Sequence, residues 1–266
     1  MDKERRQTRS VGKLRNLCRL IIVGASRERE LSTQELLPIE EELLNRPTNQ
    51  LLNDFGAGRA SPGSGSAAAL LSLLAAKMIN TVCEISTKKP ECEVSKKEFE
   101  FIIKVIKEEI EPRLKQLFEL DAKDFEKVVS LRVKRDRAES QAEKTKYTKE
   151  SLDLLEIATN YTFEVGEISI RLMSFGVVMF EKGWHAVRGD SGVSLSAAMS
   201  GVMSAIFIAN LNLKTLKKRK YAKESMARCQ SLQDNLNKLQ AQAFSCVTTI
   251  SSESISSIQL ELEKDI

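Results

Sequence analysis

The chain has 266 residues, 42% apolar and 29% charged, which is the profile of a globular protein with one large domain or two small ones. Its net charge is +4, and residues 1–28, with eight basic and three acidic side chains, account for all of it, so the rest of the chain is close to neutral. This mild charge argues against a nucleic-acid-binding face. We expect residues 1–30 to form a basic N-terminal extension, weakly docked at most, and residues 31–266 to form one domain.

Histidine and cysteine usage narrows the possible chemistry. His185 is the one histidine, and no cysteine pair has the CxxC spacing, which argues against a transition-metal site and against Ser-His or Cys-His catalysis. Acidic residues close to the start and the lack of an apolar leader argue against a targeting peptide. We therefore expect a metal-free cytoplasmic protein with reduced thiols: Cys18, Cys83, Cys92, Cys229 and Cys246.

Apolar spacing predicts helices from the start of the domain onward. A first helix is expected over about residues 32–52, followed by a Gly-, Ser- and Pro-rich break at 54–66. The next helix begins near Ser66 and is apolar nearly all round, so it should be buried in the centre of the domain.

A longer helical pattern covers residues 95–132, and Pro112 should kink or divide it. Residues 132–150 carry many charges of both signs and few apolar side chains, so we expect a solvated connection or an exposed helix end. A further helix is predicted from about 148 to 180, and a polar last helix over 220–264. No segment shows a convincing strand period, which predicts an all-α fold.

The stretch from Ser191 to Leu213 contains no charged residue. A membrane span is the alternative here, but five serines, two asparagines and the charged amphipathic helices elsewhere favour a helix inside a soluble protein. Two stripes of small residues at four-residue spacing should let neighbouring helices approach on two sides. They are Gly192, Ser196, Ser200 and Ser204, and Ala197, Gly201, Ala205 and Ala209.

Three places have residues suited to chemistry. The first is the loop RASPGSGSAAAL at 59–70, where glycines precede a helix start and Ser66 is a natural cap. The free N–H groups of a helix start attract anions such as carboxylates. The loop lacks the lysine of a phosphate-binding GxxxxGK[ST] motif, and a capped tight turn is the simpler alternative.

The second place is the pair Asp121 and Asp124, which share one helix face. Asp121 follows Leu120 and precedes Phe125 by four residues, so we expect it to be partly buried. A carboxyl in an apolar cleft becomes a usable acid or base. A solvated pair with no catalytic role is the alternative.

The third place is WHAVRGDSGVSLSAAM, in which Asp190 sits where a capping residue would sit, two residues after Arg188. An N-cap beside a surface arginine is the alternative to a functional role, and His185 alone is a weak signal.

Together these elements resemble the cyclodeaminase/cyclohydrolase family of folate enzymes, which includes the C-terminal domain of formiminotransferase-cyclodeaminase and bacterial methenyltetrahydrofolate cyclohydrolases. The family pattern PAPGGGSAAA is similar to ASPGSGSAAA at 60–69, and its DAxAF segment is similar to DAKDF at 121–125. Its GN-x-x-x-R-S-D segment and NVxINL ending are similar to GWHAVRGD at 183–190 and IANLNL at 208–213. Order and spacing agree from about residue 48 to 250.

The resemblance implies an antiparallel bundle of about five to six long helices that forms a homodimer, with a folate site near the two small-residue helices. It implies one-carbon chemistry on a tetrahydrofolate derivative, without a metal. The main expectation is cyclodeamination of 5-formiminotetrahydrofolate to 5,10-methenyltetrahydrofolate and ammonia. Cyclohydrolase activity, which opens the methenyl ring with water, is the alternative.

The resemblance also implies roles for individual residues. Asp121 would act as the acid and base, and Asp190 would orient the substrate or stabilise the cationic amidine. The loop Gly63, Ser64, Gly65 and Ser66 would hold the ligand through backbone N–H groups. Arg188 and Lys214 would meet the glutamate carboxylates of folate, and Asn212 is the retained asparagine of the family's last motif.

The chain departs from the family pattern at Ser64, Trp184, Gly189 and Ile208. These changes motivate a second class of function, a non-catalytic folate-binding or helical scaffold protein. The basic N-terminus motivates a third, a helical adaptor for an acidic partner.

Overall fold

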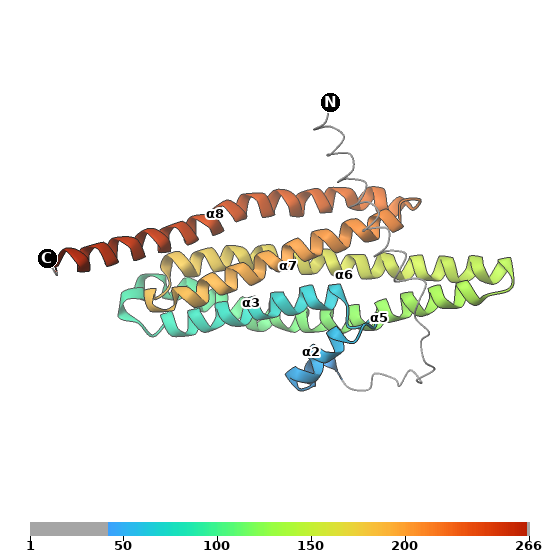
Figure 1. Ribbon diagram of the computed structural model, residues 1–266, viewed down its shortest axis with the longest axis horizontal. Coiled ribbons are helices and arrows are strands. Elements are labelled where there is room, and N and C mark those ends of the chain that lie inside the picture. Colours follow the sequence, from blue (N-terminus) through green and yellow to red (C-terminus); the bar gives the residue numbers. More distant parts are fainter. Residues whose placement is uncertain (1–41, 265–266) are drawn as a thin grey trace, which may run out of the picture. The chain divides into compact units, whose positions relative to one another are not determined.

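The computed structural model describes residues 42–264, and every regular element in that range is helical (Figure 1). Four of the short helices are η1 (Leu43–Asn45), α2 (Thr48–Gly56), η2 (Pro90–Ser95) and α4 (Lys96–Val105), of which the last two follow the long helix α3. The long helices are α3 (Ser64–Ser86), α5 (Glu111–Arg137), α6 (Gln141–Lys182), α7 (Arg188–Thr215) and α8 (Lys220–Lys264). This confirms the predicted all-α fold. The compact unit begins at Glu42, so the predicted extension over 1–30 and domain start at 31 lie outside the described residues.

The central helices pack antiparallel. Gly201 of α7 lies against Ser72 of α3, whereas the backbone N–H of Trp184, just before α7, donates to Ser86 Oγ at the other end of α3 (2.9 Å). Helix α6 is also antiparallel to α7, because Gly166 lies against Ala205 whereas Gly176, later in α6, lies against Leu195, earlier in α7. The predicted antiparallel bundle is therefore confirmed, with α3, α6 and α7 at its core (Figure 1).

Small residues account for the close approach of these helices. A Cβ atom on Gly201 would lie 2.5 Å from Ser72 Oγ and 2.7 Å from Ser169 Oγ, and these two hydroxyls share a hydrogen bond of 2.7 Å. Ala205 and Ala209, on the same stripe of α7, are fully buried. The other small-residue stripe of α7, which includes Ser196 and Ser200, faces outward instead. Only one of the two predicted contact sides is thus used within the described chain.

Proline interrupts two of the predicted helices: the break at Pro47 was not predicted, whereas the predicted division at Pro112 is confirmed. The helix predicted over 32–52 is interrupted in its described part, because Pro47 is the N-cap of a separate helix that ends at Gly56. Pro112 lies in the first turn of α5, and its missing N–H coincides with a π-helical segment, Ile106–Ile110, just before it.

The other boundaries shift by a few residues. Helix α6 starts at Gln141 instead of about 148, because Ser140 Oγ caps it by accepting the Glu143 N–H (3.2 Å). Helix α3 starts at Ser64 with Gly63 as N-cap, so Ser66 lies inside the helix and is not its cap. Likewise α7 starts at Arg188, which places Asp190 in the first turn and not at the cap.

Two helical stretches are long and apolar enough to cross a membrane by length and composition alone, Ser64–Ser86 and His185–Thr215. About half of each is buried against other helices, 56% and 44% of the most apolar window. A core helix of a soluble protein has the same properties, so the expectation of no membrane association stays a prediction.

Replacing Gly201 with alanine should destabilise the protein by about 1–3 kcal/mol, because the new methyl group would meet two serine hydroxyls in a tightly packed contact. Gly56→Ala, at the end of α2, is the control, because a Cβ there has no neighbour within 4 Å. Urea denaturation followed by circular dichroism measures both. Equal midpoints for the two variants would contradict this account of the packing.

Candidate active site

Asp121 lies on the core-facing side of α5. Leu114, Leu117 and Phe118 precede it at helical spacing and are fully buried, so the same stripe carries the aspartate inward. Its residue exposure is only 7%. The predicted partial burial of Asp121 is confirmed, and the residue is almost completely enclosed.

The carboxylate of Asp121 rests against the first turn of α3. Ser66 Oγ donates to Asp121 Oδ2 (3.0 Å), and the backbone N–H of Ser66 also bonds to the carboxylate. Asp121 Oδ1 lies so close to Gly65 that a Cβ atom there would be 2.1 Å away. Glycine at position 65 therefore permits the contact. The helix start does bind a carboxylate, and this carboxylate belongs to the protein itself.

Burial raises the pKa of Asp121, because the charged form loses contact with water. The hydrogen bonds from Ser66 oppose that shift, and the nearby charge of Asp124 adds to it. The net result is a pKa above the ordinary value of 3.8. An aspartate with a raised pKa and well-placed donors is better suited than a solvated one to accept and return a proton.

Tyr161 of α6 is a neighbour that the sequence did not reveal. Its hydroxyl donates to Asp124 Oδ2 (3.1 Å), and Lys127 Nζ lies 3.0 Å from Asp124 Oδ1. Burial and the bond to Asp124 raise the pKa of Tyr161. The sequence around Tyr161 is typical of an aromatic residue in a helical core, so nothing in it indicates a functional role. Tyr161 reaches the site because α6 packs against α5.

A narrow cleft connects these groups. Its walls come from α3, α5 and α6, and the space between them is too small for a water molecule. The walls must therefore part before any ligand reaches Asp121. The lining residues are Gly65, Ala68, Leu117, Asp121, Tyr161, Thr162 and Val165.

The structure brings some of the other predicted site residues to this end of the bundle. Since α3 and α7 are antiparallel and Ser72 faces Gly201, the start of α3 lies level with the last turns of α7. Asn212 is partly buried there, and Lys214 is exposed. Asn212 shares a helix face with Gly201 and Ala205, which point toward α6 and α3.

Arg188 and Asp190 lie at the opposite end. With a rise of about 1.5 Å per residue, Asp190 is about 27 Å along α7 from the level of Gly65. Arg188 is already engaged there, because Nη1 lies 2.8 Å from Glu253 Oε2 of α8 and the guanidinium stacks on Phe180. His185 contacts Arg188 (3.2 Å) and so lies at this same end of the bundle. Within a single chain, Arg188 and Asp190 therefore lie far from Asp121, although the sequence analysis placed all three in one site.

Metal ligands and reactive thiols are not found beside Asp121. Within the described residues, no group of three His, Cys, Asp or Glu side chains is arranged to hold a metal ion. The cysteines of this range, Cys83, Cys92, Cys229 and Cys246, are buried and unpaired. Burial raises the pKa of Cys83 to about 12, so its thiol stays protonated at neutral pH.

Asp121→Asn should stabilise the protein at neutral pH relative to the native chain. The native-state pKa of Asp121 lies above its unfolded value, so the folded state binds more protons in that window and stability falls as pH rises through it. An asparagine at position 121 does not titrate, so the variant does not lose stability as pH rises through this window. Thermal unfolding at a series of pH values should therefore show a stability difference that is largest above this window and shrinks as pH falls toward 3.8. A constant difference across pH would count against a raised pKa.

Comparisons with known proteins agree with this geometry. The family model for formiminotransferase-cyclodeaminase matches residues 47–231. Among solved structures, the fold is similar to formiminotetrahydrofolate cyclodeaminase from Thermotoga maritima, with a TM-score of 0.68 and 16% identity over 79% of this chain and 100% of that one. A comparison with curated proteins found no match. Because the family match spans most of the sequence and includes the start of α3, Asp121 and the whole of α7, the chain belongs to the formiminotransferase-cyclodeaminase family.

Proposed function

We propose that this protein is a formiminotetrahydrofolate cyclodeaminase, a cytoplasmic enzyme that converts 5-formiminotetrahydrofolate to 5,10-methenyltetrahydrofolate and ammonia. The observation that carries the proposal is the buried Asp121 carboxyl, held against the start of α3 by Ser66 and permitted by Gly65. A site of this kind suits a reaction whose main requirement is the movement of protons.

In the proposed reaction, N10 of the substrate attacks the carbon of the protonated formimino group. A C–N10 bond forms, and Asp121 accepts the proton that N10 loses. Asp121 then returns this proton to the formimino nitrogen, the C–N bond breaks and ammonia leaves. The product is the methenyl cation, which an ionised Asp121 stabilises by its negative charge.

Access to Asp121 requires the cleft to open. The first-turn N–H groups of Ser64 and Gly65 have no carbonyl partner within α3, and they are the donors that a bound ligand would meet. Tyr161 and Thr162 form the facing wall on α6. A bidentate ion pair between Arg113 and Glu164 (2.5 and 2.6 Å) joins α5 to α6 beside that wall and limits how far it moves.

A second copy of the chain would account for Arg188 and Asp190. We propose a homodimer that uses the outer face of α7, defined here by Val193, Ser196, Ser200 and Met203. Val193 and Met203 are exposed, and the absence of charge between Ser191 and Leu213 removes repulsion between two copies. A two-fold axis near Ser200 would bring Asp190 of the partner subunit to the level of Asp121.

The enzymatic proposal is tested by a spectrophotometric assay with 5-formiminotetrahydrofolate, in which methenyl absorbance should rise. Asp121→Asn should lower kcat/KM by about 10²–10⁴-fold, because proton transfer by a placed side chain contributes that much. Asp136→Asn is the control, since Asp136 lies exposed on the same helix and pairs with Arg135. Full turnover by the Asp121 variant would remove Asp121 from the mechanism.

The same assay separates the other candidate functions. Loss of absorbance from added 5,10-methenyltetrahydrofolate would identify a cyclohydrolase. Binding of both folates without turnover would identify a non-catalytic folate-binding scaffold, for which the changed family residues and the closed cleft are the supporting observations.

The dimer is tested by Met203→Glu, which places a charge on the outer face of α7. The dissociation constant of the dimer should rise at least ~100-fold, because a carboxylate would be buried without a partner. Phe101→Glu is the control, because Phe101 is also an exposed apolar residue but lies on α4. Light scattering coupled to size exclusion gives the masses. A Met203→Glu variant with the native dimer mass would show that the interface lies elsewhere.

A further inference from the structure

The hydroxyl of Tyr161 has a fixed hydrogen-bond direction at the Asp121 cleft. Tyr161 lines this cleft from α6. Its O–H donates to Asp124 Oδ2 (3.1 Å), and a phenol has only one proton to donate. The lone pairs of the Tyr161 oxygen are therefore the groups that remain for a ligand, so toward the cleft Tyr161 is a hydrogen-bond acceptor.

Asp124 is held so that it accepts this bond. The residue is 8% exposed, and Lys127 Nζ lies 3.0 Å from its other oxygen, Oδ1. The ammonium group of Lys127 donates and never accepts, so it engages Oδ1 and leaves Oδ2 to Tyr161. Each oxygen of Asp124 thus has its own donor, and the direction of the Tyr161 bond is set.

The groups around the Tyr161 hydroxyl together oppose the loss of its proton. Burial raises its pKa first, the bond to Asp124 adds to the rise and the charge of Asp121 adds further, whereas the charge of Arg113 lowers it. The net pKa lies above the ordinary value of 10.0. At neutral pH the phenol is therefore protonated and keeps its bond to Asp124.

Asp124 is also a departure of this chain from the family resemblance. The family segment DAxAF has an alanine where DAKDF has Asp124. An alanine there would leave the Tyr161 hydroxyl free to rotate and to donate into the cleft. The bond also joins α5 to α6, but the bidentate pair of Arg113 with Glu164 already does so. The direction of the hydroxyl is thus the distinctive effect of Asp124.

We propose that Tyr161 determines specificity by accepting a hydrogen bond from an N–H group of the ligand, and that Asp124 is the residue that positions its hydroxyl for this. The role rests on the proposed function, in which the formimino nitrogen enters the cleft. A protonated formimino group carries N–H donors. A formyl group has the same shape but presents a carbonyl oxygen, and two facing acceptors leave each other unsatisfied. The site should therefore select nitrogen over oxygen at this atom.

Binding of 5-formimino- and 5-formyltetrahydrofolate tests this selectivity, because the two compounds differ only in that group. Isothermal titration calorimetry gives both Kd values, and every chain carries Asp121→Asn so that turnover does not consume the substrate. This parent chain should bind the formimino compound about tenfold or more tightly than the formyl compound. Adding Tyr161→Phe should remove the difference.

Adding Asp124→Asn to the parent should go further and favour the formyl compound. Lys127 can only donate, so it keeps the amide oxygen, and the amide NH₂ turns to Tyr161. The O–H of Tyr161 is then released toward the ligand and suits a carbonyl oxygen. Loss of the Asp124 charge alone would give no preference for the formyl compound beyond that of the Tyr161→Phe chain.

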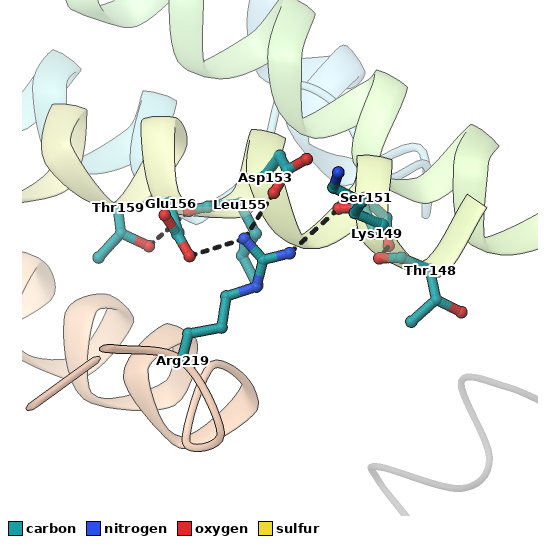
Figure 2. A network of polar contacts seen from close by, with 8 residues as sticks. All are labelled: Thr148, Lys149, Ser151, Asp153, Leu155, Glu156, Thr159 and Arg219. Atoms are coloured by element: carbon teal, nitrogen blue, oxygen red, sulfur yellow. Dashed lines mark hydrogen bonds and ion pairs between the residues drawn. The ribbon is translucent and has the colours of Figure 1, made fainter. Parts of the chain in front are cut away.

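Asp153→Asn is the matched control. Figure 2 shows Asp153 on α6 with Arg219, whose Nη1 lies 2.5 Å from Asp153 Oδ1 and 2.9 Å from Glu156 Oε1. The variant loses the same charge and one polar contact of α6, and Asp153 does not line the cleft. It should keep the preference of the parent chain.

A second readout needs no folate. In chains that keep Asp121, the tyrosinate absorbance step that Tyr161→Phe removes belongs to Tyr161. Asp124→Asn should move this step to lower pH, because the acceptor and its charge both raise the pKa of Tyr161. A step that does not move would overturn the positioning by Asp124.

The binding data separate this role from the proposed function. Failure of both folates to bind the parent chain would contradict the proposed function. Binding of both folates with equal affinity, or a preference that survives Tyr161→Phe, would contradict only the role of Tyr161. A preference that Asp124→Asn leaves unchanged would contradict the role of Asp124. Thermal unfolding of each variant verifies that it is folded.

Discussion

The contact between Asp121 and the first turn of α3 constrains more of this molecule than any other. A carboxylate removed from water needs compensating donors, and Ser66 supplies two. Those donors are within reach only because Gly65 lacks a side chain, which fixes the depth at which α3 lies against α5. The burial of Asp121 therefore depends on the same contact that sets the spacing of the helices around it.

The helices could be predicted from the sequence because their apolar periodicity is local. Asp121 could also be singled out, since Leu120 and Phe125 placed it on an apolar stripe. The role of Tyr161 could not be found, because it depends on how α5 pairs with α6 across many residues of chain. For the same reason the position of Asp190 could not be foreseen. A helix start is recognisable in sequence, but its direction in a bundle is not.

The two small-residue stripes of α7 show that a sequence pattern which permits close helix packing does not by itself show that the packing occurs within the chain. Both have the spacing that permits close helix contact, yet only the stripe of Gly201 and Ala205 is buried by α3 and α6. The stripe of Ser196 and Ser200 has the same spacing, is rich in serine where the other is rich in alanine, and faces outward. Composition alone thus indicates that a helix face can pack closely, and the fold decides whether the partner comes from the same chain.

The ion pair of Arg188 with Glu253 has a consequence for ligand recognition. Glu253 belongs to the last third of α8, beyond the residues that match the family, and it occupies the guanidinium that the resemblance assigns to folate carboxylates. Any incoming carboxylate must exchange with it. Glu253 at the end of α8 therefore competes with any anion for Arg188 and weakens its binding. Salt screens both the attraction of the anion to Arg188 and the Arg188–Glu253 ion pair that the anion must replace, so anion binding depends on ionic strength through both interactions.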